Sequence, residues 1–503
     1  MPILPKEILS EIAAKQIVVL SDRYPPRSFG GAELSLHNAL SAADQSTRAK
    51  TLVILFDSDI SKPLLYSIKQ ISVLCLPDAA NWPFNSSPKH LHVARLRSIA
   101  YRHFLKYGWP LASIFEPKNF WRRIGALYLE VFQKPRGGVL SDFLIDRRDY
   151  RVGLLKKVLA ATDCKRLVAD NTRSIVIGSL AGAGIQSSVA IVRDNRFSCP
   201  RHNQIMMVNG KYCGACDLSC AAEDSKGSQL ARRIQRSHLF AVKKFRAQRL
   251  ASFNTVVVTS HFLARNTRAL LGAEADIRRI PNPVGSLPEL LTACRGVAES
   301  ARNDILVVGM LNEAKGQLDL VRNAVRWLKG DSSLRLIFAG RGDRTKKAIQ
   351  DWARKSGIEK QIHFLNYLDR TQTFRAMRSC KLVLLPTRWK EPFGRVPLEA
   401  AIARKPVVSF AVGGLCETII DGYSGVLVEP LNYEKLFAAC DRLLADGELR
   451  QRLGSNAFEH VVLNYADDKT SSHLMSVLSE AEWNLAKTEA PPRLVPTREN
   501  AVA

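Results

Sequence analysis

The chain has too few acidic residues to balance its basic ones. Its 503 residues include 73 Lys and Arg against 47 Asp and Glu, which gives a formal charge of +26. A surplus of this size attracts anions such as nucleic acid, acidic lipid headgroups or phosphorylated small molecules. No nucleic-acid recognition motif accompanies the charge, so we predict no nucleic-acid partner.

The sequence also lacks a long apolar run. Its longest span without a charged residue is Ser174–Val192, and serines, glycines and a glutamine interrupt it. Membrane spans are more apolar, so a Gly/Ala-rich helix, a turn and a buried strand are predicted here. Residues 1–16 carry acids and no apolar core of a secretory signal. We therefore expect a cytoplasmic protein, held at most peripherally on the inner face of a membrane.

Cysteine is too sparse for a disulfide scaffold, because the chain has ten in 503 residues. Six are scattered in mostly apolar contexts and are interpreted as small core residues: Cys75, Cys164, Cys294, Cys380, Cys416 and Cys440. The other four cluster within residues 199–220: Cys199, Cys213, Cys216 and Cys220. Four thiols with a C-x-x-C element suit a closed structural zinc site, and loop cysteines, a redox pair or an iron–sulfur cluster are the alternatives.

Short runs of Val, Ile and Leu are abundant and alternate with helical patterns. One series runs through QIVVL, TLVILF, ISVLCL, KRLVAD, VAIVRD and TVVVTS, and a second begins after residues 281–290. Continuous apolar strands of this kind predict parallel sheets covered on both faces. We predict an α/β protein with two doubly wound, Rossmann-like domains facing a central cleft. Residues 1–290 form the first, 291–470 the second, and 471–503 a C-terminal helix and disordered tail.

Two basic regions interrupt the first domain. Residues 225–250 contain eight Lys or Arg and no acid, and residues 83–157 are basic and aromatic. Residues 83–157 include an aromatic and basic face with two possible roles. It either lies on an anionic membrane or belongs to a core-packed helix with a solvated basic side. That face comprises Phe120, Trp121, Arg122, Arg123, Leu127, Tyr128 and Phe132.

The segment EPFGRVPLE, residues 391–399, combines a glycine and a proline with two acids. Proline fits a helix only in its first turn. Pro397 therefore places a helix start near Arg395 or Val396, directly after Gly394.

The two acids of this segment flank that helix start. The helix is expected to end at Arg404 and Lys405, where cations suit its dipole. Its free N–H groups can bind phosphate, while Glu391 and Glu399 can accept bonds from hydroxyls. A ligand with both phosphates and hydroxyls is a nucleotide-sugar. The plainer alternatives are a capping role for Glu399 and a solvated loop position for Glu391.

A glycine pair, Gly30 and Gly31, lies between the first predicted strand and the helix that follows it. Glycines there allow close backbone approach to a ligand, although a tight turn also needs small residues. The pair is not a full G-x-G-x-x-G, so a nicotinamide fingerprint is not supported.

Several motifs together resemble glycosyltransferase family 4, which has the two-domain GT-B fold. The resemblance rests on FGRVPLEA after Glu391 and on PVVSFAVGGLCETIIDGYSGVLVEP, with further motifs ILVVGMLNEAKG, LIFAGRGD, VVVTSHFLARN, RRIPNPV and SDRYPPRSFGGAE. It covers most of residues 15–470 and is stronger in the C-terminal half. The family implies a retaining transferase that uses an activated sugar donor and no active-site metal.

The resemblance also implies roles for individual residues. Glu399 would hold the donor ribose, and Glu391 would hold the donor sugar together with the backbone at Phe393 and Gly394. The diphosphate would be bound by N–H groups and cations, namely Arg395, Val396, Lys315 and the Gly30/Gly31 turn. Lys315 and Glu391 would be the catalytic pair, because cations and N–H donors stabilise the departing diphosphate.

The chain departs from the family pattern at two places. Met310 stands where the family usually has an arginine paired with the lysine, and a neutral thioether cannot clamp phosphate. Three arginines could compensate: Arg341, Arg388 and Arg395. Arg193-Asp194 stands where many members have His-Asp; Arg193 either binds an acidic acceptor or phosphate on the acceptor side, or forms a surface ion pair with Asp194.

From these patterns we expect a retaining glycosyltransferase that moves a sugar from a nucleotide-sugar to a glycan or lipid-linked glycan, in surface polysaccharide synthesis. The alternative is a catalytically silent protein of the same fold that binds glycans or scaffolds a complex.

Overall fold

The computed structural model describes residues 4–479, apart from residues 27–30, 79–144, 202–203, 221–228 and the single positions 146, 148, 183, 186, 209 and 215. The predicted aromatic face between residues 120 and 132 lies outside the described residues, and so does Gly30.

The first domain is built on an eight-stranded sheet that is parallel except at one edge. Its order is β10 (Ile277–Arg279), β9 (Thr255–Val258), β6 (Ser187–Val192), β5 (Arg166–Asp170), β1 (Ile17–Ser21), β2 (Thr51–Asp57), β4 (Ile71–Pro77) and β3 (Leu64–Ile68). β3 pairs antiparallel with β4, and every other pair is parallel. The six predicted strands of this half are confirmed. Half-exposed β3 and three-residue β10 were not predicted, because neither has the long apolar run of a central strand.

Alternate residues of the central strands pack on opposite faces of this sheet, and both faces are apolar. Val18 and Leu20 belong to the core under one set of helices, whereas Val19 belongs to the core on the other side. Two buried faces explain why the strands read as continuous apolar runs.

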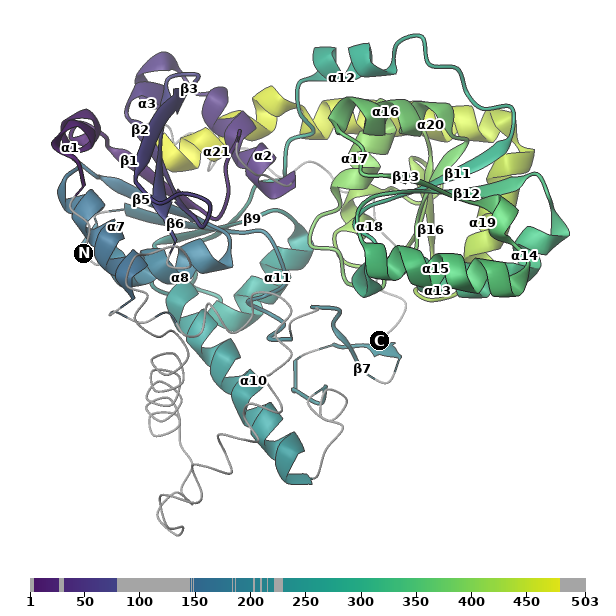
Figure 1. The fold of residues 1–503 in the computed structure, drawn as a ribbon, viewed down its shortest axis with the longest axis horizontal. Helices are drawn as coiled ribbons and strands as arrows, with labels where there is room; N and C mark the ends of the chain where they lie inside the picture. Colours follow the sequence, from purple (N-terminus) through teal and green to yellow (C-terminus); the bar gives the residue numbers. More distant parts are fainter. Residues whose placement is uncertain are drawn as a thin grey trace.

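Helices cover both faces of this sheet. α1 (Lys6–Ile12), α7 (Tyr150–Ala160), α8 (Thr172–Ala181) and α10 (Gln229–Leu250) contribute to one core, and α2 (Gly31–Ser41) contributes to the other. α3 (Gln45–Ala49) and α11 (His261–Leu271) complete the described helices of this domain, and a short hairpin of β7 (Met207–Val208) and β8 (Lys211–Tyr212) stands apart from the sheet. The basic stretch at residues 225–250 thus largely forms α10, which extends away from the sheet in Figure 1.

The second domain is a six-stranded, fully parallel sheet around one core. Its order is β13 (Ile362–Asn366), β12 (Leu334–Ala339), β11 (Asn303–Val308), β14 (Leu382–Leu385), β15 (Val407–Phe410) and β16 (Gly425–Val428). Its helices are α12 (Leu287–Cys294), α13 (Gln317–Asn323), α14 (Val325–Gly330), α15 (Asp343–Ser356), α16 (Arg370–Ser379), α17 (Arg395–Ile402), α18 (Leu415–Thr418), α19 (Tyr433–Ala445) and α20 (Gly447–Tyr465). All six predicted strands of this half are confirmed.

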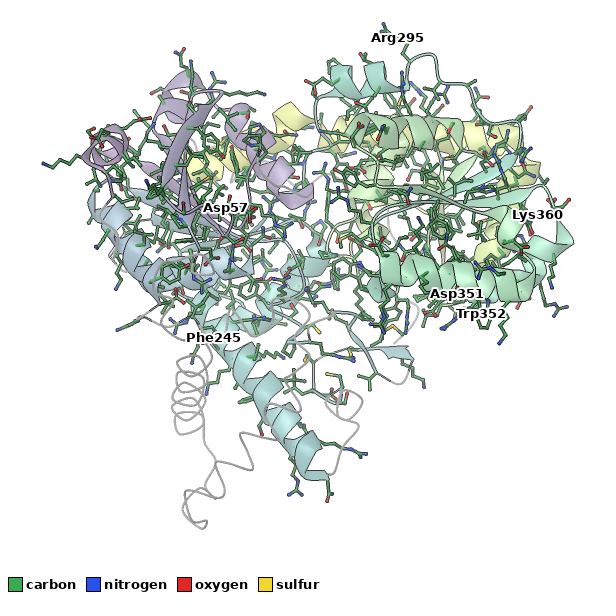
Figure 2. The ribbon with its side chains drawn as sticks, in the orientation of Figure 1. Asp57, Phe245, Arg295, Asp351, Trp352 and Lys360 are labelled. Carbon is green, nitrogen blue, oxygen red and sulfur yellow. The ribbon has the colours of Figure 1, made fainter. Side chains whose placement is uncertain are left out.

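The two domains lie side by side, and the last described helix joins them (Figure 1). α21 (Asp467–Ser479) follows the second domain in sequence but packs against α2 of the first. Four of its residues enter that core: Leu474, Met475, Val477 and Leu478. The chain therefore crosses between the domains twice, and α21 fastens its own end to the first domain. Figure 2 shows Lys360 at the far edge of the second domain, away from this junction.

None of the helices in the described part of the chain is both long and apolar enough to cross a membrane.

Leu478→Ala should destabilise the protein, because Leu478 is 1% exposed within the core that α21 shares with the first sheet. The expected loss in free energy of unfolding is about 2–5 kcal/mol, measured by urea denaturation. Leu463→Ala is the matched control, since Leu463 on α20 is 66% exposed and should cost less than about 0.5 kcal/mol. Equal effects of the two changes would show that α21 adds nothing to the core.

Candidate active site

A pocket opens in the second domain where β11 and β14 end. It has about 420 Å³ of empty space, the open mouth included. The residues that line it are Val307, Val308, Gly309, Lys315, Gln317, Leu385, Pro386, Thr387, Glu391, Gly394, Arg395, Val396, Pro397 and Leu415. β11 and β14 are neighbours from which the strand order runs in opposite directions, to β12 on one side and β15 on the other. Ligands of open α/β sheets bind at such a switch point.

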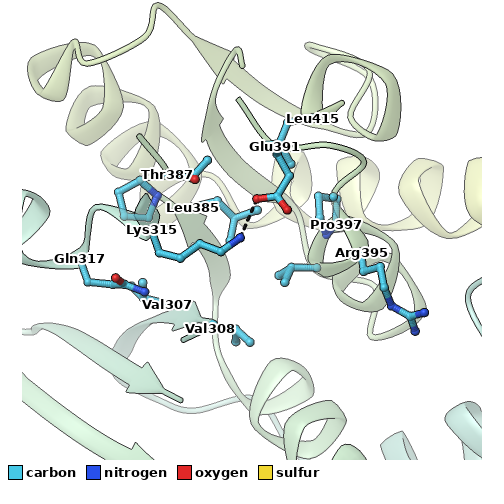
Figure 3. A pocket seen from close by; sticks show the side chains of 14 residues that line it. Val307, Val308, Lys315, Gln317, Leu385, Thr387, Glu391, Arg395, Pro397 and Leu415 are labelled. Atoms are coloured by element: carbon cyan, nitrogen blue, oxygen red, sulfur yellow. Dashed lines mark hydrogen bonds and ion pairs between the residues drawn. The ribbon is translucent and has the colours of Figure 1, made fainter. Parts of the chain in front are cut away.

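Lys315 and Glu391 meet inside this pocket. The Lys315 ammonium lies 2.6 Å from Glu391 Oε2, and the Trp389 indole N–H donates to the same oxygen at 2.6 Å. The ammonium also lies 4.7 Å from the centre of the Trp389 ring. Figure 3 shows the two charged ends pointing toward each other. The structure thus brings together two residues that stand 76 positions apart in sequence.

The predicted helix start is confirmed. Gly394 is the N-cap of α17 in a left-handed conformation, Arg395 is its first residue, and no side chain caps it. Pro397 occupies the third helical position, where its missing N–H costs nothing. The start of α17 lies at the wall of the pocket, with Arg395 and Val396 among the lining residues.

The predicted end of this helix, at Arg404 and Lys405, is wrong by two to three residues. α17 ends at Ile402, and Arg404 adopts a left-handed conformation with φ of 55°. Lys405 is buried and donates to Glu299 instead of serving the helix dipole. Arg404 lies over the Phe458 ring with 4.1 Å between its guanidinium carbon and the ring centre, so neither residue of the basic pair serves the helix end.

Three glycines hold the backbone around Glu391. A Cβ on Gly394 would lie 2.6 Å from Leu415 Cδ2, and one on Gly413 would lie 2.4 Å from the Glu391 carbonyl oxygen. Gly414 N–H donates to that same carbonyl at 2.6 Å. The loop of residues 387–392, hereafter the Glu391 loop, is thus seated on a glycine turn from PVVSFAVGG.

Arg395 links the pocket to the first domain. Its Nη1 donates to Ser35 Oγ of α2 at 2.6 Å, and its Nη2 lies 3.6 Å from Glu399. Figure 3 shows the guanidinium pointing away from the Lys315–Glu391 pair. Burial lowers the pKa of Arg395, and the Glu399 carboxylate opposes that shift. Glu399 itself is not among the lining residues and lies one turn along α17.

Met310 and two of the three compensating arginines lie outside the set of lining residues. Met310 is 66% exposed after β11. Arg341 stacks over Tyr367 with 3.9 Å between the guanidinium carbon and the ring centre. Arg388 pairs with Asp319 at 2.8 Å. Arg395 is the one of these three arginines that the pocket includes.

One of the two alternatives for Arg193, a surface ion pair with Asp194, is wrong. The Arg193 Nε donates to Asp170 at 2.8 Å, and the two side chains are 6% and 0% exposed. Its Nη1 donates to Asn282, and Asp194 pairs instead with Arg196 at 3.2 Å. Asp170, the acid that Arg193 pairs with, is the last residue of β5 and lies 23 positions away in sequence, so this pairing could not be read from neighbouring residues.

Gly31 is the first residue of α2, directly after the undescribed Gly30.

Phe393 is 4% exposed and packs edge-on to Tyr465 with ring centres 5.8 Å apart. A ligand near the pocket can therefore contact the backbone of Phe393 but not its buried ring.

The clustered cysteines share one region without forming a tight group. Burial raises the pKa of Cys199 to about 11, with a contribution from the nearby Cys216 and Cys213 thiols. Cys220 is buried with Leu218 and Leu239. Among the residues that the structure describes, no three His, Cys, Asp or Glu side chains assemble as a metal-holding group. Structural zinc therefore stays a prediction that rests on the four-thiol donor set.

Sequence reasoning missed Trp389 and Gln317. Trp389 directly precedes Lys390 and Glu391, so its place in the same loop was visible, but its bond to the Glu391 carboxylate was not. Gln317 donates to the Met310 carbonyl at 3.0 Å and lines the pocket.

Part of the chain is similar to known glycosyltransferases. Residues 296–460 match the model of the family described as glycosyl transferases group 1. An uncharacterised glycosyltransferase of Methanocaldococcus jannaschii is 32% identical over 34% of this chain and 44% of its own length. Glycogen synthase of Mycobacterium tuberculosis is 32% identical over 32% and 39%. D-inositol 3-phosphate glycosyltransferase of Stackebrandtia nassauensis is 28% identical over 46% and 57%. These matches support the group 1 family, and they span 39% to 57% of the relatives' own length.

Solved structures match nearly the whole chain. Sucrose-phosphate synthase from Thermosynechococcus elongatus has a TM-score of 0.62 at 16% identity, over 93% of this chain and 98% of its own. Anabaena HepE, solved in complex with UDP and glucose, has a TM-score of 0.56 at 18% identity, over 92% and 99%. The protein has the GT-B fold. The fold predicted from the sequence is therefore confirmed.

Gly394→Ala should cost about 2–4 kcal/mol in the free energy of unfolding. The position has φ of 95°, and the new methyl would collide with Leu415. Gly357→Ala is the control, because Gly357 is also left-handed but has nothing within 4 Å, so it should lose only about 1 kcal/mol. Chemical denaturation of both variants measures the difference, and equal losses would mean that the packing of Leu415 against Gly394 tolerates the methyl.

If the four cysteines hold zinc, purified protein should contain about one zinc per chain by elemental mass spectrometry. Cys213→Ser should lose the metal, whereas Cys164→Ser, outside the cluster, should keep it. Protein with negligible zinc, or equal zinc in both variants, would rule out this site.

Proposed function

We propose that the protein is a retaining glycosyltransferase that moves a sugar from a nucleotide-sugar donor to a glycan or lipid-linked glycan, in surface polysaccharide synthesis. The observation that carries the proposal is the pocket in which Lys315 and Glu391 meet beside the uncapped start of α17. HepE, which shares the fold, has been solved with UDP-glucose, and it supports a donor of the same class here.

In this proposal the helix start and Lys315 hold the diphosphate. N–H groups at a helix start attract phosphate, and the Lys315 ammonium adds a full charge within the same pocket. Lys315 already bonds Glu391, yet an ammonium has three donors. It can therefore keep that contact and still reach a leaving phosphate, whose charge grows as the bond to the sugar breaks.

Glu391 holds hydroxyls of the donor sugar rather than acting as a general base. Its Oε2 accepts from both Lys315 and Trp389, which keeps the carboxylate oriented. The second oxygen can accept from a sugar hydroxyl at the pocket. Transfer then occurs on one face of the sugar, and the departing phosphate assists deprotonation of the acceptor.

Arg395 supplies the cation that Met310 cannot. Among the three candidate arginines it alone lines the pocket, and its bond to Ser35 places it between the domains. Glu399, paired with it, would bind the ribose after Arg395 turns toward the phosphates.

The acceptor is proposed to approach from the first domain. The positive charge of the chain, +26, suits an anionic acceptor or a peripheral position on an anionic membrane. Arg193 is occupied by Asp170 and Asn282, so it shapes this side through a buried ion pair rather than an open charge.

A second candidate function is a catalytically silent protein of the same fold that binds glycans or scaffolds a complex. Met310 favours it, since a phosphate clamp is missing at the end of β11.

Lys315→Ala and Glu391→Ala should each lower donor hydrolysis or transfer by about 10²–10³-fold, because both remove a contact to the reacting group. The assay uses a panel of nucleotide-sugars. Lys435→Ala is the control, since Lys435 pairs with Glu429 on the exposed surface, and it should stay within about twofold of wild type.

Equal rates in wild type and both pocket variants would refute the site assignment. If wild type turns over none of the donors and calorimetry detects no nucleotide binding, the silent alternative replaces the proposed function.

A further inference from the structure

The cysteine segment of residues 199–220 contacts the second domain at the Glu391 loop. The Lys390 ammonium donates to the Cys213 carbonyl at 2.8 Å and lies 5.9 Å from the centre of the Tyr212 ring. Tyr212 itself packs against the core of the second domain. In Figure 1 the β7 hairpin lies between α10 and the second domain.

The cysteine segment is in turn fixed to the first domain. Lys243 of α10 donates to the Cys216 carbonyl at 3.3 Å, and Arg236 donates to the Asp217 carbonyl at 3.3 Å. The Cys213 N–H donates to the Met206 carbonyl at 2.8 Å. Because α10 anchors one side of the segment, the Cys213 carbonyl is a fixed acceptor for Lys390.

The Glu391 loop has further ties to the first domain on both sides of Glu391. Asn195 donates to the Lys390 carbonyl at 2.7 Å, and the Ser260 hydroxyl donates to the Pro392 carbonyl. The residues flanking Glu391 are therefore held by groups of the other domain. Of these ties, Lys390 is the one made by a side chain of the loop itself.

We propose that Lys390 is a positioning residue for Glu391: through the Cys213 carbonyl it fastens the Glu391 loop to the cysteine segment and sets the carboxylate where it meets Lys315. The consequence for catalysis rests on the proposed function, but the fastening itself does not. No contact of Lys390 with the pocket is involved, because Lys390 is not among the lining residues.

The chemistry favours an ammonium at this place. A charged donor to a carbonyl makes a stronger bond than a neutral donor, and partial burial keeps water from competing. The Tyr212 ring face adds an attraction for the cation. A misplacement of about 1 Å at a reacting group can cost about 10²-fold in rate, so a loosened loop should act on kcat.

The test compares Lys390→Met, Lys390→Arg and Lys381→Met in the full chain. Methionine keeps the length of the side chain and removes the donor, whereas arginine restores one. Lys381→Met is the matched control, because Lys381 makes a 2.7 Å bond to Glu299 at a different part of the second domain. Hydrogen–deuterium exchange of the peptide covering residues 387–393 is measured first, and thermal melts confirm that all three variants fold.

In Lys390→Met we expect exchange of this peptide to rise about tenfold, with exchange elsewhere in the second domain unchanged. With the donor that wild type uses, kcat should fall about tenfold while KM changes less than about threefold. Lys390→Arg should return both quantities to within about threefold of wild type.

Unchanged exchange in Lys390→Met, or a rise equal to that in Lys381→Met, would overturn the positioning role. If wild type shows no turnover with any donor, the proposed function fails, and the exchange result still decides whether Lys390 fastens the loop. Faster exchange with unaltered kcat would show that Lys390 holds the loop without positioning Glu391.

Discussion

The seating of the Glu391 loop between the two domains is the constraint on which the rest of the site depends. Groups of the first domain bind the carbonyls of Lys390 and Pro392, and the Gly414 N–H binds the carbonyl of Glu391 between them. A loop held at three successive carbonyls has little freedom. Its side chain at Glu391 can therefore meet Lys315 at one defined place beside α17.

Further contacts at the same junction hold the two domains against each other. Glu417 of α18 accepts from the N–H groups of His261 and Phe262, which start α11 in the first domain at 2.7 and 2.8 Å. A carboxylate at a helix start is favourable because of the helix dipole and the unpaired N–H groups there. Together with Arg395–Ser35 and the return of α21, this contact fixes the orientation of the second domain relative to the first. A change in that orientation would reach Glu391 directly.

Much of the fold follows from local patterns in the sequence. Apolar runs such as TLVILF and LVLLP are recognisable as buried parallel strands because both of their faces are covered. Pro397 predicted a helix start near Arg395 or Val396, and α17 begins at Arg395. The sequence could not show the end of that helix, because Lys405 donates to Glu299, which lies over a hundred positions away. Likewise Arg193 and Asp194 are adjacent in sequence but have separate partners, because the end of β5 brings Asp170 next to Arg193.

By itself the sequence determined two doubly wound α/β domains, a glycine-led helix start, and the residue types that suit phosphates and hydroxyls. These features are local, because strand periodicity and the limits on proline and glycine act within a few residues. Only the tertiary structure decided which of the polar residues meet. It paired Lys315 with Glu391, assigned Arg395 rather than Arg341 or Arg388 to the pocket, and placed the cysteine segment against Lys390. Such contacts depend on where loops from distant strands converge, and that depends on the packing of both sheets and of one domain on the other.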